Sequence, residues 1–110
     1  MKVIAFFDLK EKTDPEEFLA WTRNKQATVF KKKIRGMKNF RVYITSGTDG
    51  NIQLPKMVQI FDYGGTADDW RKILKDFRKT GNKEISKIVK EWLDFCEDES
   101  TKILYIDDMS

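Results

Sequence analysis

The chain has 110 residues, 40% of them hydrophobic, and a formal net charge of +3, which predicts one globular domain over residues 1–110 and by itself implies no nucleic-acid partner. It contains no histidine, which excludes Ser–His and Cys–His nucleophilic machinery, histidine-ligated haem and the usual zinc sites. Cys96 is the only cysteine, so an internal disulfide and a cysteine-based metal cluster are excluded as well.

No apolar run in the sequence is long enough for a signal peptide or a membrane span. We therefore expect a cytoplasmic protein with no membrane partner. We also expect no metal site and no organic cofactor.

The first predicted strand, residues 2–10, is apolar on both of its faces. Val3 and Phe7 lie on one face, and Ile4 and Phe6 lie on the other. A half-exposed strand would alternate apolar and polar residues, so both faces of this strand should be covered. It is therefore expected near the centre of the sheet.

A helix is predicted to begin at Pro15, with Asp14 as its N-cap and Glu17 at the third position. On a helical wheel, Lys25 and Gln26 fall inside the apolar arc of this helix. Either their long side chains reach past the arc to solvent, or they point into a polar pocket between helix and sheet. Gly36 is expected to end the segment.

The remaining elements follow from period-2 and period-3.6 patterns. Strands are predicted over residues 40–45, 57–63 and 102–107, and a turn-rich connection over residues 46–55. Two helices are predicted between the last two strands, the first capped by Thr66 and separated from the second at Gly81-Asn82. The order strand, helix, strand, strand, helix pair, strand predicts an α+β, ferredoxin-like fold. In it, helices cover one face of a four-stranded antiparallel sheet whose first and third strands are central.

The face that no helix covers is expected to be largely apolar. Alternation along the strands assigns to it Ile4, Phe6, Met57, Phe61, Ile103 and Tyr105, and to the helix side Val58, Ile60, Leu104 and Ile106. Because a bare patch above roughly 600 Å² is unusual on a monomer, we expect an isologous homodimer joined through this face. The alternative is a monomer in which tyrosines make the face merely amphipathic.

Two short patterns suggest a relationship: Asp14-x-x-x-Phe18-x-x-Trp21-x-Arg23 in the first helix and Phe40-x-Val42-Tyr43 in the second strand. With these, the chain resembles the dimeric α/β-barrel superfamily, and within it the small RedY-like proteins associated with prodiginine biosynthesis. The resemblance implies two paired ferredoxin-like sheets and a pocket between sheet and helices. It also implies relatives such as cofactor-independent antibiotic-biosynthesis monooxygenases, lactone isomerases and haem-degrading enzymes, and the missing histidine argues against haem chemistry.

A pocket in that place would be lined from the first helix and the neighbouring strands. The candidates are Trp21, Lys25, Gln26, Arg41, Tyr43 and Tyr63. An aromatic wall with a few polar groups suits a small, flat organic ligand. Tyr43 or Asp8 could move a proton, and Arg41 or Lys25 could hold an oxyanion, so the catalytic residues stay unknown.

Three functions remain open at this point: a monooxygenase-like or isomerase-like enzyme, a non-catalytic ligand-sensing or interaction module, and an RNA-binding domain. The segment from Arg23 to Arg41 carries eight basic residues and no acidic one. The third strand, however, lacks the Lys/Arg-Gly-aromatic pattern of an RNA-binding motif, so nucleic acid is the least favoured partner.

Overall fold

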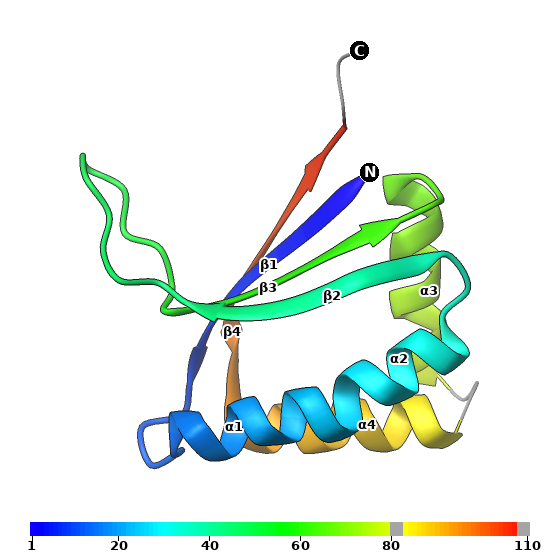
Figure 1. Ribbon diagram of the computed structural model, residues 1–110, viewed down its shortest axis with the longest axis horizontal. Helices are drawn as coiled ribbons and strands as arrows, with labels where there is room; N and C mark the ends of the chain where they lie inside the picture. The colour runs from blue at the N-terminus through cyan, green and yellow to red at the C-terminus, as the bar shows by residue number, and fades with distance from the viewer. Residues whose placement is uncertain (80–82, 108–110) are drawn as a thin grey trace.

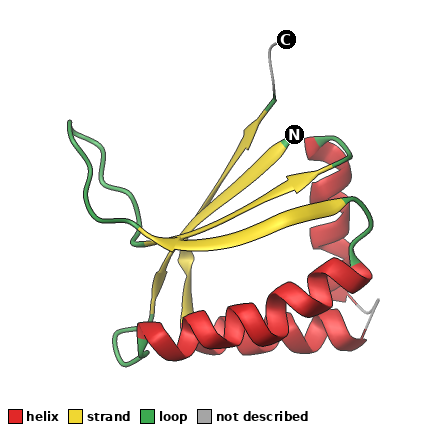
Figure 2. Cartoon of the chain, viewed as in Figure 1, coloured by secondary structure: helices red, strands yellow, loops and turns green. Residues whose placement is uncertain are grey.

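A computed structural model describes residues 1–79 and 83–107, with the backbone alone for residues 77–79. The elements, in chain order, are β1 (Lys2–Leu9), a long helix in three parts (α1, Pro15–Trp21; η1, Thr22–Gln26; α2, Ala27–Lys33), β2 (Met37–Ile44), β3 (Met57–Tyr63), α3 (Ala67–Lys79), α4 (Lys83–Phe95) and β4 (Cys96–Ile106). The strands form one antiparallel sheet in the order β2-β3-β1-β4. The helices lie on one side of it, and the β2–β3 connection projects away from them (Figures 1 and 2). The predicted ferredoxin-like fold with central β1 and β3 is confirmed.

Two helix starts show how local sequence sets the element boundaries. Asp14 caps α1 by accepting the N–H of Glu16 at 3.0 Å. At α3, the hydroxyl of Thr66 accepts the N–H of Asp69 at 3.2 Å, and the Asp69 carboxylate accepts the N–H of Thr66 at 3.0 Å. The predicted helix break at Gly81-Asn82 lies outside the described residues. None of the described helices has the length and hydropathy that crossing a bilayer requires.

The long helix contains one wide, π-helical turn, η1. The N–H of Ala27 donates to the carbonyl of Thr22, five residues earlier, and this spacing defines a π-helical turn. The extra residue in such a turn shifts the helix face that follows. As a result Gln26 is buried whereas Lys25 is exposed, although a regular helical wheel places both on the apolar arc.

The register of β3 corrects part of the predicted uncovered face. Phe61 lies directly opposite Val3, and Met57 lies directly opposite Phe7. Directly opposed residues share one face of a sheet, and all of these belong to the core beneath the helices. The prediction that Met57 and Phe61 face a partner is therefore wrong.

The same correction applies to β4, where Tyr105 lies opposite Val3 and Ile103 lies opposite Ala5. Both are on the side of the helices, and the guanidinium of Arg71 in α3 lies 5.0 Å from the centre of the Tyr105 ring. The alternation misleads because the outward-facing residues of β3 and β4 are apolar too. The apolar residues on the uncovered face are Ile4, Phe6, Tyr43, Val58, Ile60, Leu104 and Ile106.

Two adjoining clusters of buried side chains fill the space between sheet and helices. The first contains Val3, Ile34, Met37, Phe61, Tyr63, Trp70 and Ile85, and the second contains Phe7, Phe18, Trp21, Met57, Ile88 and Cys96. They fix the long helix against the sheet at both ends of η1.

Candidate functional site

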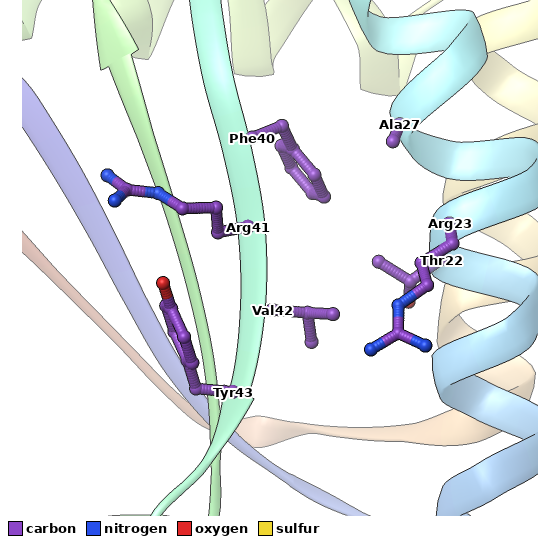
Figure 3. Close-up of a pocket in the computed structure, with 7 residues that line it drawn as sticks. All are labelled: Thr22, Arg23, Ala27, Phe40, Arg41, Val42 and Tyr43. Carbon is purple, nitrogen blue, oxygen red and sulfur yellow. The ribbon is translucent and has the colours of Figure 1, made fainter.

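A crevice of about 230 Å³ opens between the long helix and the edge strand β2 (Figure 3). Its lining residues are Thr22, Arg23 and Ala27 from the helix, and Phe40, Arg41, Val42 and Tyr43 from the strand. Typical pockets for drug-sized ligands are about 300–1,000 Å³. The crevice is smaller than these pockets, and its volume leaves room for a molecule of one or two rings.

Thr22 lines this crevice and carries an unusual polar group, a buried hydroxyl without a partner. The residue is only 1% exposed, and its Oγ1 has no hydrogen-bond partner among the described residues. Within a helix such a hydroxyl commonly bonds to a backbone carbonyl one turn earlier, and that bond is not made here. Leaving a buried hydroxyl unpaired costs about 1–3 kcal/mol, which a bound molecule with a polar atom would offset once a χ1 rotation turned the hydroxyl into the crevice.

Arg23 follows Thr22 in the same π-helical turn and is exposed at the mouth of the crevice. Its guanidinium is directed towards β2, near Val42 (Figure 3). Among the described residues it makes no hydrogen bond and no ion pair. Its five N–H donors and its charge are thus free to meet a ligand.

The wall opposite the helix is apolar. Phe40 lies edge-on to Phe30, with ring centres 6.0 Å apart, and stacks on Phe61 at the same distance. Just before Phe40, Asn39 adopts φ +55° at a bulge in β2. Bulges re-aim side chains, and here Phe40 and Val42 point towards the helix (Figure 3).

Arg41 and Tyr43 were candidates for the pocket, and both side chains turn to the other side of β2 (Figure 3). The Nε of Arg41 donates to the carbonyl of Asn39 at 3.2 Å. Tyr43 is 47% exposed on the uncovered face of the sheet. These two residues form the rim of the crevice and supply no polar group to its interior.

Gln26 and Gln59 form a buried amide pair beside the crevice. The Gln26 amide donates to the Gln59 oxygen at 3.1 Å, and the Gln59 amide donates back at 2.7 Å. Gln59 is the register partner of Val42, so the pair lies one strand further in than the apolar wall. It ties η1 to β3 and holds the inner side of the crevice in place.

The other predicted pocket residues do not join this group. The indole N–H of Trp21 donates to Glu91 at 2.9 Å, and the ammonium of Lys25 lies 4.0 Å from the same carboxylate. Trp21 and Lys25 line a second hollow, of about 420 Å³, between α1 and α4. Tyr63 packs in the core against Trp70, and burial raises the pKa of its hydroxyl. The six predicted residues therefore do not converge.

The sequence-based candidates for the pocket did not include Thr22 or Gln59. Gln59 carried a usable signal, since it is the only uncharged polar residue in the otherwise apolar run Met57–Phe61. Thr22 and Gln26 are four residues apart on the helix, the spacing at which two polar groups share a face.

The crevice contains hydrogen-bond donors and an apolar wall, and no group placed for proton transfer. Its described lining residues include no Asp, Glu, Lys or Cys, and the Tyr43 side chain points away. Cys96 lies in the core, where burial raises the pKa of its thiol. Among residues 1–79 and 83–107, no group of three or more acidic or cysteine side chains is placed to hold a metal ion.

The fold and this crevice define a ferredoxin-like α+β protein with a small polar-and-apolar site between its first helix and its sheet. No protein-family model and no curated protein matches the sequence. The narrower likeness to RedY-like proteins stays a prediction.

Three solved structures resemble the fold. A hypothetical protein from Arabidopsis thaliana, At3g17210, has a TM-score of 0.63 and 12% identity, covering 99% of this chain and 88% of its own. A dimeric protein of unknown function with a ferredoxin-like fold, from Bacteroides fragilis, has a TM-score of 0.53 and 17% identity over 94% and 90% of the two chains. An ethyl tert-butyl ether D (EthD) family protein from Bacillus halodurans has a TM-score of 0.55 and 17% identity over 98% and 97%. At these identities the likeness shows the fold alone.

Proposed function

We propose that this protein binds a small organic molecule in the crevice between η1 and β2, and that it acts as a homodimer in the cytoplasm. The observation that carries the binding proposal is the hydroxyl of Thr22, which is buried without a partner beside a space of about 230 Å³. Phe40 and Val42 supply an apolar surface on the opposite wall. One polar contact plus an apolar wall is the usual composition of a small-molecule site.

The side chains favour recognition over catalysis. A monooxygenase-like or isomerase-like reaction needs a group that accepts a proton from the substrate. The nearest titratable side chain of suitable type on β2 is Tyr43, which turns away from the crevice (Figure 3). A non-catalytic role as a ligand sensor or carrier is therefore the better supported of the two.

The homodimer proposal rests on the uncovered face of the sheet. Tyr43, Leu104 and Ile106 are 47%, 49% and 41% exposed on it. These three side chains alone leave on the order of 300 Å² in water, and the partly buried Ile4, Phe6 and Ile60 on the two strands between them join them into one apolar surface, comparable to the largest patch on many monomers. A second copy would cover the face symmetrically, and the similar B. fragilis protein is described as dimeric.

The dimer can be tested with two matched Leu→Lys substitutions. Leu104 lies on the uncovered face, whereas Leu93 is 38% exposed on α4. In sedimentation at micromolar concentration, we expect the unmodified protein and Leu93→Lys to have twice the 13.0 kDa chain mass, and Leu104→Lys to have the chain mass. A 13.0 kDa particle for the unmodified protein, or an intact Leu104→Lys dimer, would overturn the proposed interface.

Binding can be located with two matched Ala→Leu substitutions. Ala27 lines the crevice, and Ala20 lines the hollow between α1 and α4. The probes are 2-naphthoate and its neutral carboxamide, 2-naphthamide, titrated into ¹⁵N-labelled protein and followed by amide chemical shifts. Molecules of this size reach dissociation constants of about 1 mM or lower in a good site.

We expect saturable shifts around Thr22, Phe40 and Val42, lost in Ala27→Leu and kept in Ala20→Leu. Binding that survives Ala27→Leu and is lost in Ala20→Leu would move the site to the other hollow. Failure of both probes to bind at millimolar concentration would refute the proposed function.

A further inference from the structure

We propose that the crevice selects an organic anion, whose charge is held by Arg23 while its apolar part lies against Phe40 and Val42. This inference rests on the proposed function and names the ligand class of the same site. The juxtaposition that carries it is an exposed, unpaired guanidinium next to a buried, unpaired hydroxyl, in a crevice whose opposite wall is apolar.

Arg23 forms no ion pair with any described residue. Arginine side chains near carboxylates normally form ion pairs, as Arg71 does with Asp68 at 2.8 Å. Arg23 has no such partner in the described part of the chain, and its exposed guanidinium lies at the mouth of the crevice, between the helix and β2 (Figure 3). A guanidinium binds a carboxylate or a similar oxyanion through two parallel hydrogen bonds.

The charged residues that line the crevice are all basic. The described residues that line the crevice include Arg23 and Arg41 and no Asp or Glu. They belong to the segment from Arg23 to Arg41, which carries eight basic residues and no acidic one. A site lined by one sign of charge concentrates ligands of the opposite sign, so this mouth attracts anions and repels organic cations.

The hollow between α1 and α4 has a mainly acidic lining. That hollow is larger, about 420 Å³, but Glu17, Glu91 and Asp94 line it together with Lys25. Three carboxylates against one ammonium disfavour an anion there. The charges of the lining residues thus favour an anion in the crevice between η1 and β2, although volume alone would favour the hollow between α1 and α4.

The hydroxyl of Thr22 and the guanidinium of Arg23 lie at different depths in the crevice. Thr22 is fully buried, whereas Arg23 is exposed at the mouth, so their donors lie at the inner wall and at the entrance. A ligand that satisfies both carries its anionic group at one end, with a second oxygen or nitrogen within reach of Thr22. The limited volume restricts the body between them to one or two rings.

The test compares 2-naphthoate with 2-naphthamide, which have the same shape and differ in charge. Titrations followed by amide shifts are run on the unmodified protein, Arg23→Gln and Arg35→Gln. Arg35 is the matched control, because it is an exposed arginine of the same basic segment that does not line the crevice.

We expect the unmodified protein to bind 2-naphthoate about tenfold more tightly than 2-naphthamide, as a charge-assisted hydrogen bond would give. Arg23→Gln should remove this preference and leave 2-naphthamide affinity within about twofold. Arg35→Gln should keep the preference.

Equal binding of the two probes, with the site otherwise located in the crevice, would overturn the anion inference and leave the proposed function standing. A preference that survives Arg23→Gln, or that is lost equally in Arg35→Gln, would overturn the role of Arg23. Loss of binding for both probes in the unmodified protein would refute the proposed function itself.

Discussion

Replacing Thr22 by valine should stabilise the free protein while weakening its ligand binding. Valine keeps the β-branched shape of threonine and removes the hydroxyl, whose oxygen is buried without a partner. Removing an unpaired polar group from a 1% exposed position should raise the free energy of unfolding by about 1–2 kcal/mol. For a chain of 110 residues this corresponds to a rise in Tm of about 4–8 °C.

The measurement is thermal unfolding by circular dichroism, combined with titration of 6-hydroxy-2-naphthoate, whose hydroxyl supplies a second polar group at the end opposite the carboxylate. All variants are compared at one protein concentration, because the Tm of a dimer depends on it. Thr28→Val is the control: Thr28 is exposed on α2, so the same chemical change should alter stability by less than about 0.5 kcal/mol. Only Thr22→Val should gain stability and lose affinity together.

The opposite signs make the prediction easy to refute. If Thr22→Val is less stable than the unmodified protein, the hydroxyl already has a partner in the folded chain. If its affinity for 6-hydroxy-2-naphthoate is unchanged, the hydroxyl does not contact the ligand. Either result would remove the observation on which the binding site depends.

Three further predictions concern other parts of the molecule. Asp62 accepts hydrogen bonds from Lys2 at 2.8 Å and Asn39 at 2.7 Å, which hold its pKa below the usual 3.8. Asp62→Asn should therefore lower stability near neutral pH, and the deficit should vanish as the pH falls through the folded-state pKa, as denaturant titrations at several pH values would show. Gln26→Leu should cost about 1–3 kcal/mol by leaving the Gln59 amide unpaired, and Gln26→Leu/Gln59→Leu should recover much of it in a double-mutant cycle. Cys96, 1% exposed with a raised thiol pKa, should react with a thiol reagent only as fast as the protein unfolds.

Each of these predictions has a distinct contrary result. A deficit of Asp62→Asn that persists or grows in acid would mean that the carboxylate is not stabilised in the folded state. A double variant no better than Gln26→Leu alone would mean that the amide pair supplies more than mutual satisfaction. Labelling of Cys96 in seconds under native conditions, at the rate of the denatured chain, would show that the thiol is accessible.

The order of the elements and the starts of two helices were predictable because their signals are local, whereas β2 and β4 begin three and six residues earlier than predicted. Asp14 and Thr66 cap their helices with side chains that lie within three residues of the groups they bind. The phase of β3 was not predictable in this way. Met57 and Phe61 alternate with Val58 and Ile60, so both faces read as apolar, and only pairing with β1 decides which face is covered.

The site was less predictable than the fold, for two physical reasons. The π-helical turn that buries Gln26 and exposes Lys25 depends on which carbonyl each N–H selects, and no residue type marks that selection uniquely. The alternation of β2 separates Phe40 and Val42 from Arg41 and Tyr43, as the structure does, but the list of pocket candidates took residues from both faces of this strand because sequence does not show which face borders a void.

The most direct test of the central claim is the position of bound 2-naphthoate, measured by intermolecular nuclear Overhauser effects in the unmodified protein. We expect contacts from its ring protons to the methyl groups of Thr22, Ala27 and Val42, and none to the methyl group of Ala20. Contacts to Ala20 without the other three would place the ligand between α1 and α4 and contradict the proposed site.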